Sequence, residues 1–146
     1  MRRRLAVATV LLLAACDAYA FAWDSSTGTL VVGFVWNGGS GTVIIEAPET
    51  VTAGQAFEVT VNSFGSSSCV RADRLDVAVA GSVARLTPYD RVAPTDTPCT
   101  EDFGAHPHTA SVTFTTPGPA VLEAHGRSAS GDTVVTKDVL VRAGSR

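Results

Sequence analysis

The stretch of sequence that decides the fold runs from residue 51 to residue 61 and reads VTAGQAFEVTV. After a short turn at Ala53-Gly54, the apolar residues Phe57, Val59 and Val61 alternate with polar ones. Successive side chains of a strand point to opposite faces of a sheet. A period of two with one apolar face therefore predicts a half-buried strand of an antiparallel sheet.

The same kind of pattern recurs on both sides of this stretch. Runs of β-branched or alternating apolar residues stand between turn residues, which is typical of strands. The predicted strands cover residues 30–36, 42–47, 57–61, 75–80, 83–89, 110–115, 120–126 and 134–141. Turn signals every 8–12 residues or so favour a sandwich over a fold with crossover helices, and we predict an all-β domain of about seven to eight strands.

The segment from Gly54 to Val61 resembles the start of the second strand in bacterial immunoglobulin-like domains. The two strands on either side of Pro117-Gly118-Pro119 are also similar to the closing hairpin of such domains. The resemblance implies an immunoglobulin-like antiparallel β-sandwich and implies nothing about activity. The cysteine and tryptophan spacing of antibody domains is missing, because Trp36 precedes Cys69 by more than thirty residues.

The N-terminus carries an export signal. Arg2, Arg3 and Arg4 precede an uncharged apolar run over residues 5–15. This run is too short to span a bilayer as a helix, which needs roughly twenty residues. A positive start followed by a short apolar run is typical of a secretory signal peptide, which is removed from the mature protein.

The apolar run ends in Leu13-Ala14-Ala15-Cys16, which resembles the lipobox of bacterial lipoproteins. The resemblance implies a signal peptide over residues 1–15 and a diacylglycerol on Cys16 as the new N-terminus. Residues 16–28 are then a tether and residues 29–146 the sandwich domain. We expect a membrane partner, through the lipid anchor, and a location in the cell envelope. Cleavage after the Ala-Tyr-Ala motif that ends at Ala20 would instead release a soluble protein.

The charge and the cysteines agree with an exported protein. The net charge is −3, and three of the eleven basic residues belong to the signal, so nucleic acid is not an expected partner. With Cys16 assigned to lipid, Cys69 and Cys99 remain, and in an oxidising compartment such a pair is most simply a disulfide. Closing a loop of about 30 residues stabilises the fold by roughly 3.5 kcal/mol in the chain-entropy model.

We predict a long loop from Asp90 to Pro107 as the functional surface, because long loops in compact domains are commonly functional. Tyr89, Arg91 and Phe103 are the candidate binding residues, since binding surfaces favour aromatic and guanidinium groups. The first hypothesis is a non-catalytic binding or assembly module that presents this loop to an envelope protein or glycan.

The second hypothesis is a metal-binding envelope protein that uses His106, His108 and His125. A His-x-His pair on a strand places both rings on one face, and a third histidine from a neighbouring strand would complete a three-nitrogen site. No motif ties a histidine to a nucleophile, and the serines before Cys69 lack a G-x-S-x-G elbow. We therefore expect neither an enzyme nor a cofactor.

Overall fold

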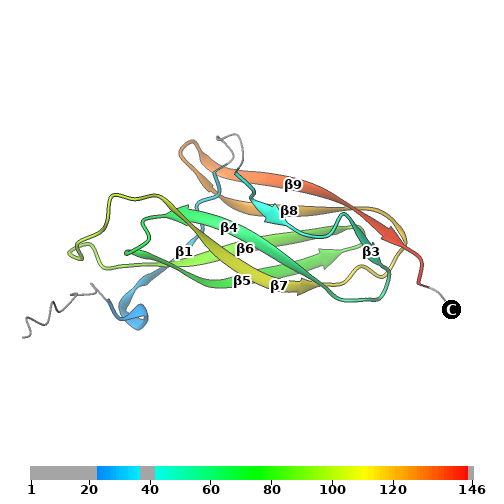
Figure 1. Ribbon diagram of the computed structural model, residues 1–146, viewed down its shortest axis with the longest axis horizontal. Coiled ribbons are helices and arrows are strands. Elements are labelled where there is room, and N and C mark those ends of the chain that lie inside the picture. Colours follow the sequence, from blue (N-terminus) through cyan, green and yellow to red (C-terminus); the bar gives the residue numbers. More distant parts are fainter. Residues whose placement is uncertain (1–22, 37–41, 145–146) are drawn as a thin grey trace, which may run out of the picture.

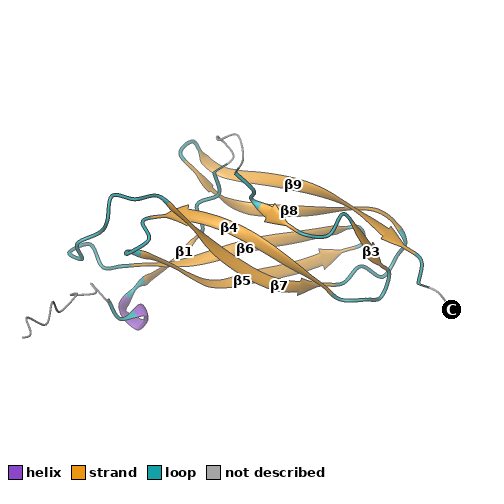
Figure 2. Ribbon diagram, in the orientation of Figure 1, coloured by secondary structure: helices purple, strands orange, loops and turns teal. Residues whose placement is uncertain are grey.

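The computed structural model describes residues 23–36 and 42–144, most of which lie in β-strands (Figures 1 and 2). The predicted signal peptide, Cys16 and the first part of the tether lie outside the described residues. The described chain begins with a 3-10 turn, η1 (Ser25–Thr27). The strands are β1 (Thr29–Val32), β2 (Ile45–Glu46), β3 (Thr50–Thr52), β4 (Phe57–Gly65), β5 (Val70–Ala80), β6 (Val83–Val92), β7 (Gly104–Val112), β8 (Gly118–Ser128) and β9 (Gly131–Arg142).

These strands form two sheets, so the predicted all-β sandwich is confirmed. The larger sheet has the order β1-β6-β8-β9-β3, with β5 paired to the other side of β6, and the smaller sheet has the order β2-β4-β7. The predicted antiparallel pairing holds for most of the strands and is wrong for two strand pairs, because β3 pairs with β9 and β6 pairs with β8 in parallel. The described residues contain nine strands, one more than the eight predicted stretches.

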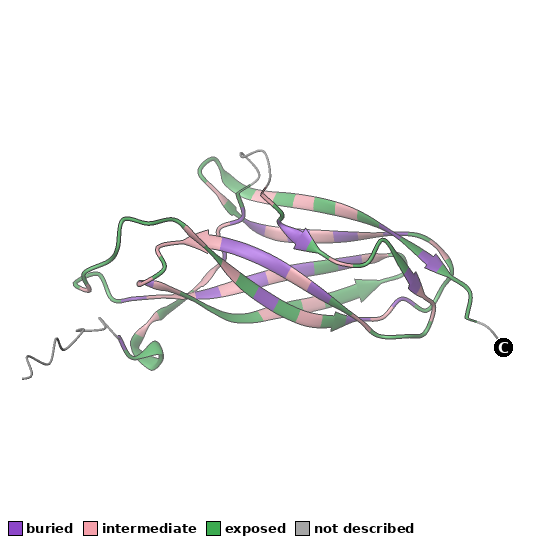
Figure 3. Ribbon diagram, viewed as in Figure 1, coloured by how far each residue is buried: buried purple, intermediate pink, exposed green. Residues whose placement is uncertain are grey.

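The core lies between the two sheets, as the buried positions in Figure 3 show. Val59 and Val61 of β4 are fully buried, as the alternation predicts, and they meet Leu86 and Leu122 of the larger sheet. Each such side chain contributes about 1.5–3 kcal/mol by leaving water. The same alternation places the polar residue Ser63 of β4 in the core.

Strand β6 contains Pro88 and continues through Asp90 to Val92, beyond its predicted end at residue 89. β1 pairs with the second half of β6 and β8 with the first half, both along the same edge. The carbonyl of Pro88 accepts a hydrogen bond of 2.8 Å from the Gly33 N–H, just past the end of β1. The N–H and C=O of one strand residue point to the same edge. An N–H at position 88 would point to the edge that β1 and β8 share, and neither strand pairs with Pro88 there. Proline is therefore tolerated at this position.

The connection between β6 and β7 is shorter than the predicted loop from Asp90 to Pro107, because both strands extend into the predicted loop. The start of the predicted loop belongs to β6, and its end, with His106 and Pro107, belongs to β7. β7 is an edge strand of the smaller sheet, and edge strands accept proline where the N–H side has no partner. Only residues 93–103 connect the two strands.

The turn at Pro117-Gly118-Pro119 does not close a hairpin. It leads from β7 in the smaller sheet to β8 in the larger one. The closing hairpin is β8–β9, which are antiparallel around a turn at residues 129–130. The prediction that the turn at Pro117-Gly118-Pro119 joins the two strands of the closing hairpin is therefore wrong.

A short segment after β1 binds both sheets and leads to the candidate site. The Val35 N–H donates to the Arg127 carbonyl of the larger sheet, and the Phe64 N–H of the smaller sheet donates to the Phe34 carbonyl, each at 2.8 Å. Gly33 makes this crossing possible, because a Cβ on it would lie 2.9 Å from Cβ of Ser63.

Candidate functional site

One end of the sandwich is held together by the predicted disulfide. Cys69, buried just before β5, is bonded to Cys99 in the loop between β6 and β7, with their Cα atoms 5.5 Å apart. The predicted pairing of Cys69 with Cys99 is confirmed. The bond ties the β6–β7 loop to the turn that precedes β5, and we call this end of the molecule the disulfide end.

Hydroxyl groups of the serine run add to this bond. Ser68 Oγ accepts the Thr100 N–H at 2.8 Å, and Ser66 Oγ donates to the Thr100 carbonyl at 2.9 Å. The Ser67 N–H donates to the Asp102 carboxylate at 3.2 Å. Hydrogen bonds from Ser67 and then from Thr100 hold the pKa of the Asp102 carboxyl below its ordinary value. The three serines therefore fix the loop in place.

Phe103, one of the predicted binding residues, lies at the centre of an exposed group of aromatic rings. Its ring centroid is 5.8 Å from those of Trp36 and Phe64 and 6.2 Å from that of Phe34. The contact with Phe64 is stacked and the other two are edge-on. Phe103 is 57% exposed and Trp36 is 40% exposed. We call these four residues the Phe103 cluster.

The cluster combines exposure with fixed geometry. Aromatic pairs at these distances contribute about 0.5–1.5 kcal/mol beyond the area that they bury. Phe103 is supported by three rings and by a loop that the disulfide holds. The sequence did not single out Phe34, Trp36 and Phe64 for this surface. The only sequence signal was that Phe34 and Trp36, two positions apart in a predicted strand, share one face.

The end of the predicted tether docks at the disulfide end. Trp23 is buried with Cys69 and Ala93, and its indole N–H donates to the Ser68 carbonyl at 2.9 Å. The guanidinium of Arg71 lies 4.7 Å from its ring. A Cβ on Gly28 would come within 2.4 Å of the Trp23 ring, so only glycine leaves room for the docked indole. Residues 23–28 are therefore part of the folded domain.

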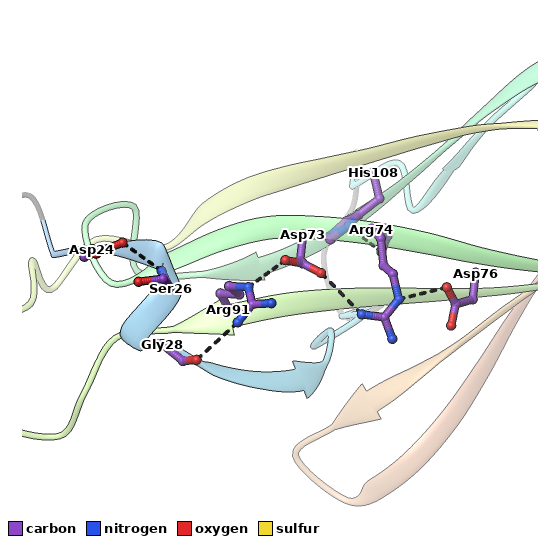
Figure 4. Close-up of polar contacts among 8 residues, drawn as sticks. All are labelled: Asp24, Ser26, Gly28, Asp73, Arg74, Asp76, Arg91 and His108. Atoms are coloured by element: carbon purple, nitrogen blue, oxygen red, sulfur yellow. Dashed lines mark hydrogen bonds and ion pairs between the residues drawn. The ribbon is translucent and has the colours of Figure 1, made fainter.

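Tyr89 and Arg91 both lie on strand β6, whereas the sequence predicted Tyr89 at the end of this strand and Arg91 in the loop. Arg91 donates to the Asp73 carboxylate at 2.7 Å and to the Gly28 carbonyl at 3.4 Å (Figure 4). The Arg74 guanidinium lies 4.2 Å from the centre of the Tyr89 ring. Both residues thus contact groups of this domain, and neither belongs to the group of aromatic rings around Phe103.

Asp73 occupies a bulge in β5, where the register with β6 shifts between Ala72 and Arg74. A bulge turns its extra residue away from the regular ladder. The Asp73 carboxylate can therefore reach the guanidinium groups of both Arg74 and Arg91. The hydrogen bond from Arg91, followed by the charges of Arg91 and Arg74, holds the Asp73 pKa below its ordinary value. This is a surface network of β5 and β6.

A serine, an aspartate and a histidine meet between the two sheets. Ser63 Oγ donates to Asp90 Oδ1 at 2.8 Å, and His108 Nε2 lies 2.9 Å from the same carboxylate oxygen and 3.0 Å from Ser63 Oγ. His108 Nδ1 lies 3.2 Å from the Arg74 carbonyl of β5 (Figure 4). The three residues are 0–3% exposed: Ser63 0%, Asp90 2% and His108 3%.

This buried network does not have the geometry of a nucleophilic triad. In such a triad the aspartate holds Nδ1 of the histidine while the serine faces Nε2. Here Asp90 and Ser63 share Nε2, and Nδ1 faces a backbone carbonyl. Both ring nitrogens of His108 thus have oxygen partners within the fold. The network links β4, β5, β6 and β7 across the interior.

The three histidines of the metal hypothesis are not brought together. His106 and His108 lie on one face of β7, as the spacing predicts, but His125 belongs to β8 in the other sheet. His125 Nε2 lies 3.0 Å from a Glu123 carboxylate oxygen beside a hollow of about 330 Å³. Within residues 23–36 and 42–144, no group of three or more His, Cys, Asp or Glu side chains is placed to hold a metal ion.

Comparisons with protein-family models, with curated proteins and with solved structures found no match for this chain. In the part of the chain that the structure describes, no helix has the length and apolar character needed to cross a membrane. A function must therefore be inferred from the chain's own residues.

Proposed function

We propose that the protein is an exported lipoprotein, anchored through an acylated Cys16, whose sandwich is a non-catalytic binding or assembly module of the cell envelope. The anchor is supported by the lipobox at residues 13–16 and by the cysteine count, which leaves a disulfide pair once Cys16 carries lipid. The contact surface is the Phe103 cluster.

The observation that carries the proposed binding role is the exposure of Phe103 and Trp36 on a rigid support. Leaving two large rings in water is unfavourable, and large aromatic side chains dominate the binding energy of many interfaces. Because the disulfide and the serine contacts already order the loop, little further conformational freedom is lost when a partner binds. The cluster is thus suited to contact another component of the envelope.

The anchor is tested by metabolic labelling. In a bacterium grown with radiolabelled palmitate, the protein should be labelled, and Cys16→Ala should abolish the label and leave a longer precursor. Normal processing of Cys16→Ala after Ala20 would contradict the lipoprotein assignment.

The contact surface is tested with a photoreactive phenylalanine analogue placed at position 103 of the intact lipoprotein in its membrane. Illumination should give crosslinked adducts from this position. The same analogue at Leu140, which is 47% exposed near the C-terminal end of β9, is the matched control and should give few. Equal adduct yields at both positions, or none at position 103, would contradict the proposed surface.

A further inference from the structure

We infer that the Phe103 cluster faces the surface of the bilayer that holds the lipid anchor, so that Trp36 and Phe103 enter its interfacial region. This inference rests on the proposed acylation of Cys16. It names the lipid interface, and not a protein or glycan, as the partner of the cluster.

The first argument is that the last part of the tether and the loop that carries Phe103 lie at the same end of the sandwich and are linked by hydrogen bonds. Trp23 donates to the Ser68 carbonyl, and the neighbouring Ser67 N–H donates to Asp102. Asp102 directly precedes Phe103, whose ring contacts Trp36. Figure 1 shows the start of the described chain and the β6–β7 loop at one end of the molecule and the C-terminus at the other.

The second argument is the reach of the tether. Trp23 follows Cys16 by seven positions, and seven fully extended residues span at most about 25 Å. Strand β9 alone has twelve residues, or roughly 40 Å, and runs along the long axis of the sandwich. The tether is therefore shorter than the sandwich, and it keeps the disulfide end near the lipid headgroups.

The third argument is the chemistry of the rings. Tryptophan is enriched at the boundary between headgroups and acyl chains, because its ring is apolar and its N–H can bind water or headgroups. The lipid anchor already confines the domain to the bilayer, so the cluster acts at a high effective concentration. A contact made by two rings is then sufficient, although it would be too small to recruit a free protein.

The charges of the loop define the kind of lipid. Asp96, Glu101 and Asp102 are exposed on the β6–β7 loop, whereas Arg71 is the exposed basic residue beside Trp23. An acidic loop is repelled by anionic headgroups and tolerated by zwitterionic ones. We expect insertion of the rings into zwitterionic bilayers and weaker insertion when anionic lipid is added.

The experiment uses the fact that the chain has two tryptophans, one buried and one exposed. The intact lipoprotein is reconstituted into phosphatidylcholine vesicles with and without lipids brominated near the headgroup end of the acyl chains. Tryptophan emission is recorded for the wild-type protein and for two reciprocal variants. Trp23→Phe leaves the exposed Trp36 as the reporter, and Trp36→Phe leaves the buried Trp23.

Emission from Trp36 should shift to shorter wavelength and be quenched by brominated lipid, and the quenching should fall when phosphatidylglycerol is added. Emission of the Trp36→Phe variant should be quenched much less. Leu140→Trp in that variant places a control reporter near the C-terminus and should not restore quenching.

The outcomes separate this inference from the proposed function. An unquenched Trp36 in a palmitate-labelled protein overturns the bilayer contact, and protein or glycan adducts from position 103 would then identify the actual partner. Absence of the label overturns the anchor and the inference with it. Equal quenching of Trp36 and of the Leu140→Trp reporter would also overturn it, because the domain would then lie on the bilayer without a preferred end.

Discussion

The buried network of Ser63, Asp90 and His108 and the exposed Phe103 cluster reverse the usual distribution of polar and apolar side chains. The network is polar and buried, and its members bind one another and a backbone carbonyl. The cluster is apolar and partly exposed, and two of its rings still face water. Buried polar groups need partners inside the fold, and these three supply them to one another, whereas exposed rings on a rigid support are available for contact with another molecule.

The largest expected effect is the loss of one member of the buried network. Asp90→Ala removes the carboxylate that both Ser63 and His108 contact, and breaking a buried pair in this way costs about 3–5 kcal/mol. The free energy of unfolding, measured in urea, should fall by this amount. Asp76→Ala, which removes an exposed partner of Arg74, is the control and should cost no more than about 1 kcal/mol. Similar costs for the two variants would show that the network does not stabilise the fold.

The next effect concerns the disulfide that supports the cluster. Replacing Cys69 and Cys99 together by serine should lower the stability by about 2–5 kcal/mol, which is typical for a small secreted domain. It should also release the β6–β7 loop, so that the yield of crosslinked adducts from position 103 falls. If the double variant crosslinked as well as the wild-type protein, the cluster would not depend on the disulfide.

A smaller effect is expected at the centre of the cluster. Phe103→Ala removes ring contacts from a residue that is 57% exposed and should cost about 1 kcal/mol or less. Phe114→Ala, at a position that is 1% exposed, is the matched variant and should cost about 3–5 kcal/mol. Thermal unfolding of the two proteins makes the comparison. Equal losses would mean that Phe103 is a core residue and not part of a contact surface.

The smallest effect is the pH dependence of the surface network. The folded pKa of Asp73 is lowered from 3.8, so the unfolded chain binds more protons in the window just below that value. The stabilisation is complete above pH 3.8 and is lost as the pH falls through the folded pKa. Asp73→Asn should therefore flatten the acid side of the stability profile. An unchanged profile would show that the contacts with Arg91 and Arg74 carry no stability.

Much of the architecture followed from local patterns. The alternation at Phe57, Val59 and Val61 correctly predicted one buried strand face, because side-chain direction in a strand depends only on the parity of the position. The pairing of Cys69 with Cys99 followed from counting, given the lipid assigned to Cys16. The exposure of Phe103 was also predicted, since a loop residue between strands has few neighbours to cover it.

The sequence by itself thus determined the fold class, the disulfide and the exposed loop position of Phe103, because these depend on residue type and short-range periodicity. Only the tertiary structure decided that Pro88 and Pro107 lie inside strands, since the cost of proline depends on which edge of a strand has a partner. It likewise brought Asp90 and His108 together, and Phe103 next to Trp36. These contacts join residues from different strands and loops, and no local pattern in the sequence records which strands become neighbours.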